Sequence, residues 1–216
     1  MAPFPQRLLD GYRTFTTQRL PAEQSRYREL SLRGQSPEVM VIGCCDSRVS
    51  PEVIFDAGPG ELFVVRNIAN LVPVYAPDGG AHGVSAALEF AVQVLRVKHI
   101  VVLGHAQCGG VRAFIDKIEP LSPGDFIGRW MSMFIKPGET VEQRPNETMQ
   151  DFATRIEKAA VFRSLENLMT FPYVRILVER GKLQLHGAYF GVAEGSLFVL
   201  DQQAKEFRSA REVVLE

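Results

Sequence analysis

The sequence has little of what would assign the protein to nucleic acid, to a membrane or to export. Its 24 Lys and Arg against 25 Asp and Glu leave a formal net charge of −1, which gives no long-range attraction to nucleic acid or anionic lipid. It contains no apolar run of membrane-spanning length and no basic start followed by an apolar core of the kind a secretory signal has. We therefore expect a cytoplasmic protein with no nucleic acid and no membrane among its partners.

Cysteine is also scarce. The chain has three cysteines, two of them adjacent, and an odd number in 216 residues does not make a disulfide framework. Metal or redox chemistry is the better use for these thiols. With 46% hydrophobic residues and no internal repeat, the composition predicts one domain over residues 1–216, of which 1–33 form an N-terminal helical arm.

Two apolar runs carry the residues of most chemical interest. Residues 39–43 end in a glycine and then present Cys44, Asp46 and Arg48 at alternate positions, which share one side of an extended chain. Residues 100–104 end in the same way and present His105 and Cys108. If the two runs are neighbouring strands, their ends bring together two sulfurs and one imidazole.

Two cysteines and a histidine are suited to a catalytic zinc site, in which zinc takes three protein ligands and keeps one corner of its tetrahedron for water. Asp46 could accept a hydrogen bond from that water, and Arg48 could hold Asp46 ionised and oriented. The alternative is that the cysteines are small buried residues and that Asp46 and Arg48 form a structural ion pair. Strand alternation places Cys44 in register with Asp46, so we interpret Cys45 as a buried bystander.

The remaining histidines have no ligand partners at a suggestive spacing. His99 directly precedes an apolar strand and His186 lies within one, so we interpret both as structural. His82 lies in a loop rich in proline and glycine and is a possible proton carrier. The segment around Trp130 is interpreted as core or subunit interface.

The alternation of strand and helix patterns predicts the fold class. We expect an α/β fold with a mainly parallel, doubly wound sheet flanked by helices, and an antiparallel edge formed by the last two strands. The arm should lie over the body of the fold or over a neighbouring subunit.

The expected strands are 39–44, 61–65, 100–104, 183–192 and 197–200. The expected helices are 7–32 (with a second helix opening at Pro21), 84–95, one from 109, 126–134 and 147–180. A polar tail follows from 202.

Four segments together resemble the β-class carbonic anhydrases. They are Gly-Cys-Cys-Asp-Ser-Arg-Val at 43–49, Glu-Leu-Phe-Val-Val-Arg-Asn-Ile-Ala-Asn at 61–70, Ser-Ala-Ala-Leu-Glu-Phe-Ala at 85–91 and Gly-His-Ala-Gln-Cys-Gly-Gly at 104–110. The likeness runs from about residue 34 to residue 111 and returns more loosely at 186–189. The resemblance implies zinc-dependent, reversible hydration of carbon dioxide to bicarbonate and a proton.

It further implies specific roles for residues. Cys44, His105 and Cys108 would bind Zn²⁺, and Asp46 with Arg48 would be the catalytic dyad. Members of the family form dimers in which pocket residues cross between subunits, often paired into tetramers, so a homodimer or homotetramer is expected. The residues that the resemblance assigns to the substrate are Gln35, Phe63, Ile68, Phe90, Gly109 and Gly110.

The sequence departs from the family at two positions. Cys45 stands where serine or alanine is usual, which raises the question of oxidation. Val41 stands where some bacterial members have a tryptophan that helps to form an inhibitory bicarbonate site, so we do not expect that site here.

Two other functions remain open at this point. One is hydrolysis of carbon disulfide or carbonyl sulfide by the same fold and metal, since access to the pocket could change the substrate. The other is a non-catalytic zinc module for partner binding, in which Asp46 closes the zinc as a fourth ligand.

Overall fold

The structure, a computed structural model, describes residues 3–117, 119–135 and 140–213. Its centre is a six-stranded sheet in the order β2-β1-β3-β4-β5-β6, in which β1 to β4 are parallel and β5 and β6 are antiparallel. The predicted mainly parallel α/β fold is confirmed. The strands are β1 Val39–Cys44, β2 Leu62–Asn67, β3 His99–His105, β4 Gln184–Gly191, β5 Ser196–Asp201 and β6 Glu206–Ser209.

One strand was missed by the sequence analysis. β6 lies in the stretch that was interpreted as a polar tail, and it pairs with β5 through Phe198 opposite Ser209 and Leu200 opposite Phe207. Only one of its four residues, Phe207, is a large apolar residue, so the strand has too little hydrophobic alternation to be recognised from the sequence.

The register of the parallel strands places both expected ligand motifs at one edge. Gly43 of β1 pairs with Leu103 of β3, so the residues that follow them leave the sheet at the same level. Cys44 also pairs with Asn67 at the end of β2. The carboxyl ends of parallel strands are where ligands bind in folds of this kind.

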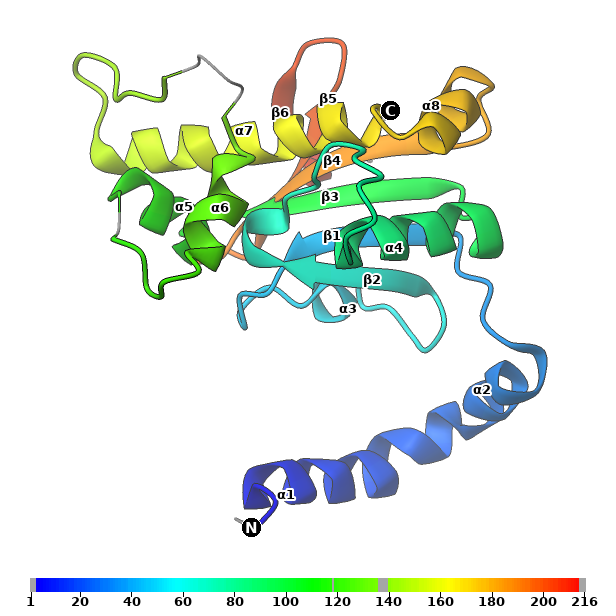
Figure 1. Cartoon of the computed structure of the whole chain (residues 1–216). Helices are drawn as coiled ribbons and strands as arrows, with labels where there is room; N and C mark the ends of the chain where they lie inside the picture. The colour runs from blue at the N-terminus through cyan, green and yellow to red at the C-terminus, as the bar shows by residue number, and fades with distance from the viewer. Residues whose placement is uncertain (1–2, 118, 136–139, 214–216) are drawn as a thin grey trace.

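The two faces of the sheet are covered unequally (Figure 1). One face packs against α4, η3, α7 and α8 around buried residues such as Met40, Ile42, Ile100 and Leu168. On the other face, around Val41 and Leu103, Ile54 of α3 and Phe55 pack against the strands. The helical segments of the body are α3 Pro51–Ile54, the 3₁₀ turn η2 Ile68–Asn70, α4 Gly83–Glu89, the π-helical η3 Phe90–Leu95, α5 Gly109–Ile115, α6 Phe126–Ser132, α7 Met149–Leu168, α8 Pro172–Glu179 and α9 Ala210–Val213.

Buried polar side chains of α7 fasten the chain that follows β2. Ser164 Oγ accepts a hydrogen bond from Val72 N at 3.2 Å and donates one to Asn70 O at 2.9 Å, and Asn167 Nδ2 donates to Val72 O at 2.7 Å. These bonds satisfy backbone groups that no strand pairs. They also hold the turn that carries Ile68 beside the ligand edge of the sheet.

The N-terminal arm consists of α1 Gln6–Thr14, the π-helical η1 Phe15–Arg19 and α2 Leu20–Arg33. Pro21 lies in the first turn of α2, as predicted, where its missing N–H costs nothing. No residue of α1 or α2 is buried. Contacts with the body come from the end of the arm nearest to it, where Arg26 Nε donates to Pro59 O at 3.3 Å and Leu30 packs on Gly60.

The arm therefore does not lie over the body of its own chain, and Figure 1 shows it running away from the sheet below β2. This corrects the first of the two placements expected from the sequence, and the placement over a neighbouring subunit stays a prediction. In the described part of the chain no helix combines the length and the apolar character needed to cross a membrane.

Candidate metal centre

Cys44, His105 and Cys108 come together at the carboxyl edge of the sheet. Cys44 is the last residue of β1, His105 the last of β3, and Cys108 immediately precedes α5. Their ligand atoms all lie within 4.8 Å of one another, and all three residues are buried. Gln107, at φ +57°, takes the left-handed conformation in the tight turn that brings Cys108 beside His105.

The donor set fits zinc. Zinc–sulfur bonds of about 2.3 Å in a tetrahedron place two sulfurs about 3.8 Å apart, and the Sγ atoms of Cys44 and Cys108 are 3.9 Å apart. His105 Nδ1 donates to Ala106 O at 2.9 Å, which leaves Nε2 as the acceptor nitrogen. This buried Nε2 has no hydrogen-bond partner among the described residues, as expected for an atom that binds a metal.

The two thiols also influence each other. Because they share a hydrogen bond, the pKa of Cys44 is lowered and the pKa of Cys108 is raised. Without a cation, only one of two adjacent buried thiols ionises readily. A divalent ion balances the charge of both thiolates, so these buried cysteines are suited to a metal.

Asp46 and Arg48 form the expected pair beside the cluster. Arg48 Nε donates to Asp46 Oδ1 at 2.9 Å and Arg48 Nη2 donates to Oδ2 at 2.7 Å, while Arg48 N also donates to Oδ1 at 3.0 Å. These bonds hold the pKa of Asp46 well below its usual range, so it is ionised at neutral pH. In this structure Asp46 is paired with Arg48 and does not belong to the group of candidate metal ligands.

The sequence predicts that strand alternation brings Asp46 and Arg48 to one side. In the structure the pair arises in another way. β1 ends at Cys44, and residues 47 and 48 form a turn in which Asp46 accepts from the backbone of Arg48. A short aspartate side chain commonly bonds the N–H two residues on in this way. Asp46 and Arg48 do form an ion pair, and the turn is the physical reason for it.

Cys45 lies outside the group of candidate metal ligands, but its predicted burial was wrong. Cys45 is an exposed free thiol, whereas Cys44 is buried. Its backbone N–H donates to Asn67 O at 2.9 Å, which continues the pairing with β2 for one residue. Because successive side chains of an extended chain point to opposite faces, the inward position of Cys44 turns Cys45 outward.

Four residues that sequence analysis did not single out support the centre. Arg66 Nε donates to Cys44 O at 2.7 Å and Arg66 Nη2 to Asp46 O at 2.6 Å. Arg48 Nη2 donates to Gln107 O at 3.0 Å. Buried Glu157 accepts from Cys108 N at 3.0 Å and from Tyr189 Oη at 2.6 Å.

A sequence signal existed for one of the four. Glu157 lies on the apolar face of a long helix, between Ala153 and Val161 at four-residue spacing, and all three are buried. A carboxylate at such a position is rare unless it has a partner. Arg66, Gln107 and Tyr189 carried no comparable pattern.

The predicted substrate residues separate into two groups. Ile68, Gly109 and Gly110 lie beside the ligands, and a Cβ on Gly110 would stand 2.5 Å from Ile68 Cγ2. Phe63 pairs with Met40, four residues before Cys44 along β1, which is about 13 Å at strand spacing. Phe90 packs on Phe63 with ring centroids 5.9 Å apart, and exposed Gln35 precedes the far end of β1.

The other histidines lie outside the centre. His99 Nδ1 and His186 Nε2 are 3.2 Å apart, and both side chains are part-buried, as expected of structural histidines. His82 Nε2 lies 2.6 Å from Asp78 Oδ1 in the loop before α4, and it lines a cavity of about 590 Å³ together with Trp130. Its role as a proton carrier stays a prediction.

Comparison with known proteins gives a consistent result. The family model described as carbonic anhydrase matches residues 39–197. Beta carbonic anhydrase 3 of Arabidopsis thaliana is 36% identical over 195 residues, which covers 88% of this chain and 74% of the relative.

Two solved structures are similar over nearly the whole chain. The β-carbonic anhydrase CcaA has a TM-score of 0.85 and 26% identity, with 94% of this chain and 98% of the other covered. A structure from a report on two tetrameric β-carbonic anhydrases of the ascomycete Sordaria macrospora has a TM-score of 0.75 and 27% identity, with 91% and 96% covered. The residues matched by the family model, 39–197, include all of the ligand edge described above.

Proposed function

This chain belongs to the β-class carbonic anhydrases, enzymes that hydrate carbon dioxide reversibly with zinc, and on that premise we propose how its own residues divide the work. Cys44, His105 and Cys108 hold the metal, and Asp46 with Arg48 forms the catalytic dyad. One observation carries this assignment. An ionised carboxylate, fixed by a guanidinium, stands next to a buried donor set that fits zinc.

Bound zinc supplies the Lewis acidity that makes a nucleophile available from water near neutral pH. Asp46 orients the reacting water. Its Oδ1 accepts from both Arg48 N and Arg48 Nε, whereas Oδ2 accepts only from Arg48 Nη2 in the described structure. Oδ2 therefore has a free lone pair for a hydrogen bond from the reacting water.

Asp46 is not a proton store. The hydrogen bonds from Arg48 lower the pKa of its carboxyl group, so Asp46 is ionised at neutral pH and acts as a hydrogen-bond acceptor. We assign to Asp46 the role of aligning the water, and to solvent or buffer the final acceptance of the proton. Ile68, Gly109 and Gly110 form the near wall of the carbon dioxide site.

We propose that the substrate site is completed by a second copy of the chain. Gln35, Phe63 and Phe90 lie too far along the sheet to reach the metal ligands of their own chain, yet Gln35 and Phe90 are exposed. A homodimer, alone or paired into a tetramer, would place them at a partner's centre. The tetrameric Sordaria macrospora relatives support an oligomer.

The same proposal gives the arm a role. We propose one domain over the whole chain, with residues 1–33 reaching over the second copy. A cytoplasmic location would suit the three free thiols, because a reducing compartment keeps them available for metal.

The test is to measure zinc content and carbon dioxide hydration by stopped flow across a range of pH, on the same reduced sample. One zinc per chain with fast hydration is the expected result. One zinc per chain without hydration at any pH would contradict the assignment of Asp46 and Arg48 and would favour hydrolysis of carbon disulfide or carbonyl sulfide. A chain that binds no zinc would contradict the ligand assignment.

A further inference from the structure

Glu157 is a buried carboxylate that the proposed chemistry does not use. It is 3% exposed, and no lysine, arginine or histidine forms an ion pair with it in the described part of the chain. Both of its oxygens are nevertheless occupied. Oε1 accepts from Cys108 N at 3.0 Å and Oε2 accepts from Tyr189 Oη at 2.6 Å. Burying a carboxylate without a cation is costly, so these two hydrogen bonds are needed to stabilise Glu157 in the interior.

The bond to Cys108 involves the peptide group that also binds Arg48. The N–H of the Gln107–Cys108 peptide donates to Glu157, while the C=O of the same peptide accepts from Arg48 Nη2 at 3.0 Å. The peptide is planar, so the direction of its N–H fixes the direction of its C=O. One rigid group therefore connects buried Glu157 to the guanidinium that pairs with Asp46.

The surrounding fold brings the carboxylate to this peptide. A Cβ on Gly104 would stand 2.7 Å from Val161 Cγ2, so the glycine allows α7 to pack closely on β3 one residue before His105. Tyr189 pairs with Gly104 in the neighbouring strand and is 4% exposed. Lys158 Nζ lies 5.3 Å from the centre of the Tyr189 ring, which fixes the ring further.

From this geometry we infer that Glu157 is a positioning residue, oriented by Tyr189, that sets the Gln107–Cys108 peptide and through it both the zinc ligand Cys108 and the guanidinium of Arg48. The inference rests on the proposed assignment of Cys108 and Arg48. Partners that hold a metal ligand in place are typically worth about 10- to 100-fold in metal affinity or activity.

The experiment compares zinc retention in a chelator competition, and the visible spectrum of the cobalt-substituted enzyme, across variants of the full chain. Glu157→Ala removes the acceptor and should weaken zinc retention by about 10- to 100-fold and change the thiolate bands of cobalt. Glu157→Gln keeps an oxygen that can accept from Cys108 N and should stay within about threefold of wild type. Tyr189→Phe should fall between the two.

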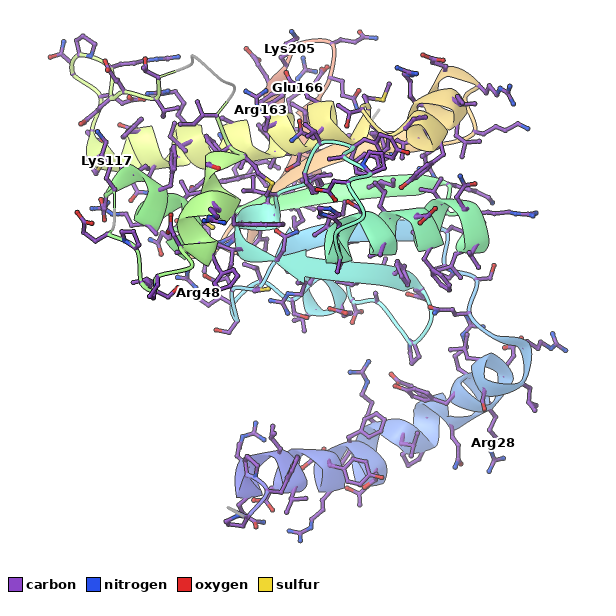
Figure 2. The ribbon with its side chains drawn as sticks, in the orientation of Figure 1. Arg28, Arg48, Lys117, Arg163, Glu166 and Lys205 are labelled. Atoms are coloured by element: carbon purple, nitrogen blue, oxygen red, sulfur yellow. The ribbon has the colours of Figure 1, made fainter. Side chains whose placement is uncertain are left out.

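Two matched controls make the same chemical changes elsewhere. Glu166→Gln alters an exposed carboxylate on α7 that pairs with Arg163, and Tyr173→Phe removes a hydroxyl from a half-buried tyrosine on α8. Figure 2 labels Arg163 and Glu166 along α7 and Arg48 apart from them, at the end of the body where β1 terminates. Both controls should retain zinc and the cobalt spectrum.

The inference is overturned if folded Glu157→Ala retains zinc as tightly as wild type with an unchanged cobalt spectrum. If Glu157→Ala does not fold, Tyr189→Phe decides, because an unaltered spectrum and affinity in that variant would equally overturn it. A wild-type chain that binds no zinc would instead contradict the ligand assignment under the proposed function. The two failures are therefore distinguishable.

Discussion

The metal centre and the N-terminal arm differ in how many of their side chains are buried or paired within one chain. At the metal centre, residues from β1, β3, α5, α7 and β4 meet, and nearly every polar atom has a partner within the chain. Along the arm, no residue is buried and apolar side chains such as Leu8 and Tyr12 are 57% and 65% exposed. In Figure 2, Arg28 of the arm and Arg48 of the centre lie at opposite sides of the molecule.

The difference shows which parts of the enzyme can be complete in a monomer. Zinc binding depends on strand register and on two short turns, both of which are internal to the chain. Gln35 and Phe90, two of the three proposed far substrate residues, remain exposed, as do apolar side chains of the arm such as Leu8 and Tyr12. Burial of an apolar stripe is what usually stabilises a helix of this kind. We therefore expect metal binding to survive separation of the subunits and catalysis to suffer from it.

The largest effect should come from a change inside the centre. Cys108→Ser removes a buried thiolate and should abolish stoichiometric zinc, with activity falling more than about 100-fold. Metal analysis and stopped-flow hydration measure the two losses. The matched control is Cys45→Ser, which makes the same substitution in the exposed thiol and should keep both zinc and activity. Full zinc content in Cys108→Ser would remove this residue from the ligand set.

A smaller effect is expected when the dyad is changed and the ligands are left intact. Asp46→Ala and Arg48→Ala should keep one zinc per chain and lose about 10²- to 10³-fold in kcat, because an aligned acceptor beside the reacting water is lost. Arg208→Ala is the control, since it breaks an ion pair of the same type, with Asp201 at 3.1 Å, far from the centre. If either dyad variant is fully active, Asp46 does not align the water.

The sequence predicted the centre better than it predicted the rest. Strand ends in parallel sheets lie at one edge, so the spacing of Cys44, His105 and Cys108 was sufficient to place them together. The burial of Cys45 was predicted wrongly because both cysteines follow the same apolar run and only the position of the strand end decides which faces inward. Arg66 was missed because its partners are backbone atoms, which leave no spacing pattern. Glu157 was missed although its place on the apolar face of α7 was a signal that it has a buried partner. The arm could not be placed from the sequence, since only residues near its end, such as Arg26 and Leu30, contact the body of the chain and none of its residues is buried.

A change in the arm tests whether the arm needs a second copy of the chain. The double variant Leu8→Asp with Tyr12→Asp puts two charges on its apolar stripe and should shift the protein to a smaller oligomer, with zinc retained and hydration reduced about tenfold. Sedimentation and stopped flow on one sample test both effects. Thr17→Asp is the control, because this residue is exposed and polar, and aspartate has a similar helix propensity to threonine. A fully active monomer would show that one chain completes its own substrate site.

The smallest effect concerns an ion pair at the start of α7, which belongs to neither of these two regions. Glu147 accepts from Arg155 Nε at 2.7 Å and Nη2 at 2.8 Å, just before the start of α7, the helix that carries Glu157. The hydrogen bond from Arg155 lowers the pKa of Glu147 from 4.5 to about 2. A carboxyl group whose pKa is lower in the folded state stabilises the fold above its unfolded pKa and loses that contribution as the pH falls toward the folded value.

Glu147→Gln should therefore lower Tm by a few degrees at pH 7, and the difference from wild type should shrink as the pH falls from 4.5 toward about 2. Thermal unfolding of wild type and of Glu147→Gln is measured at each pH. Any effect of pH on the metal acts on both proteins and therefore cancels in the difference in Tm. Zinc retention at pH 7 should stay at the wild-type level, because the pair braces the start of α7 and does not touch Cys108. A difference in Tm that does not depend on pH would mean that Glu147 acts through packing, and a loss of zinc at pH 7 would mean that the centre depends on the whole helix as well as on Glu157.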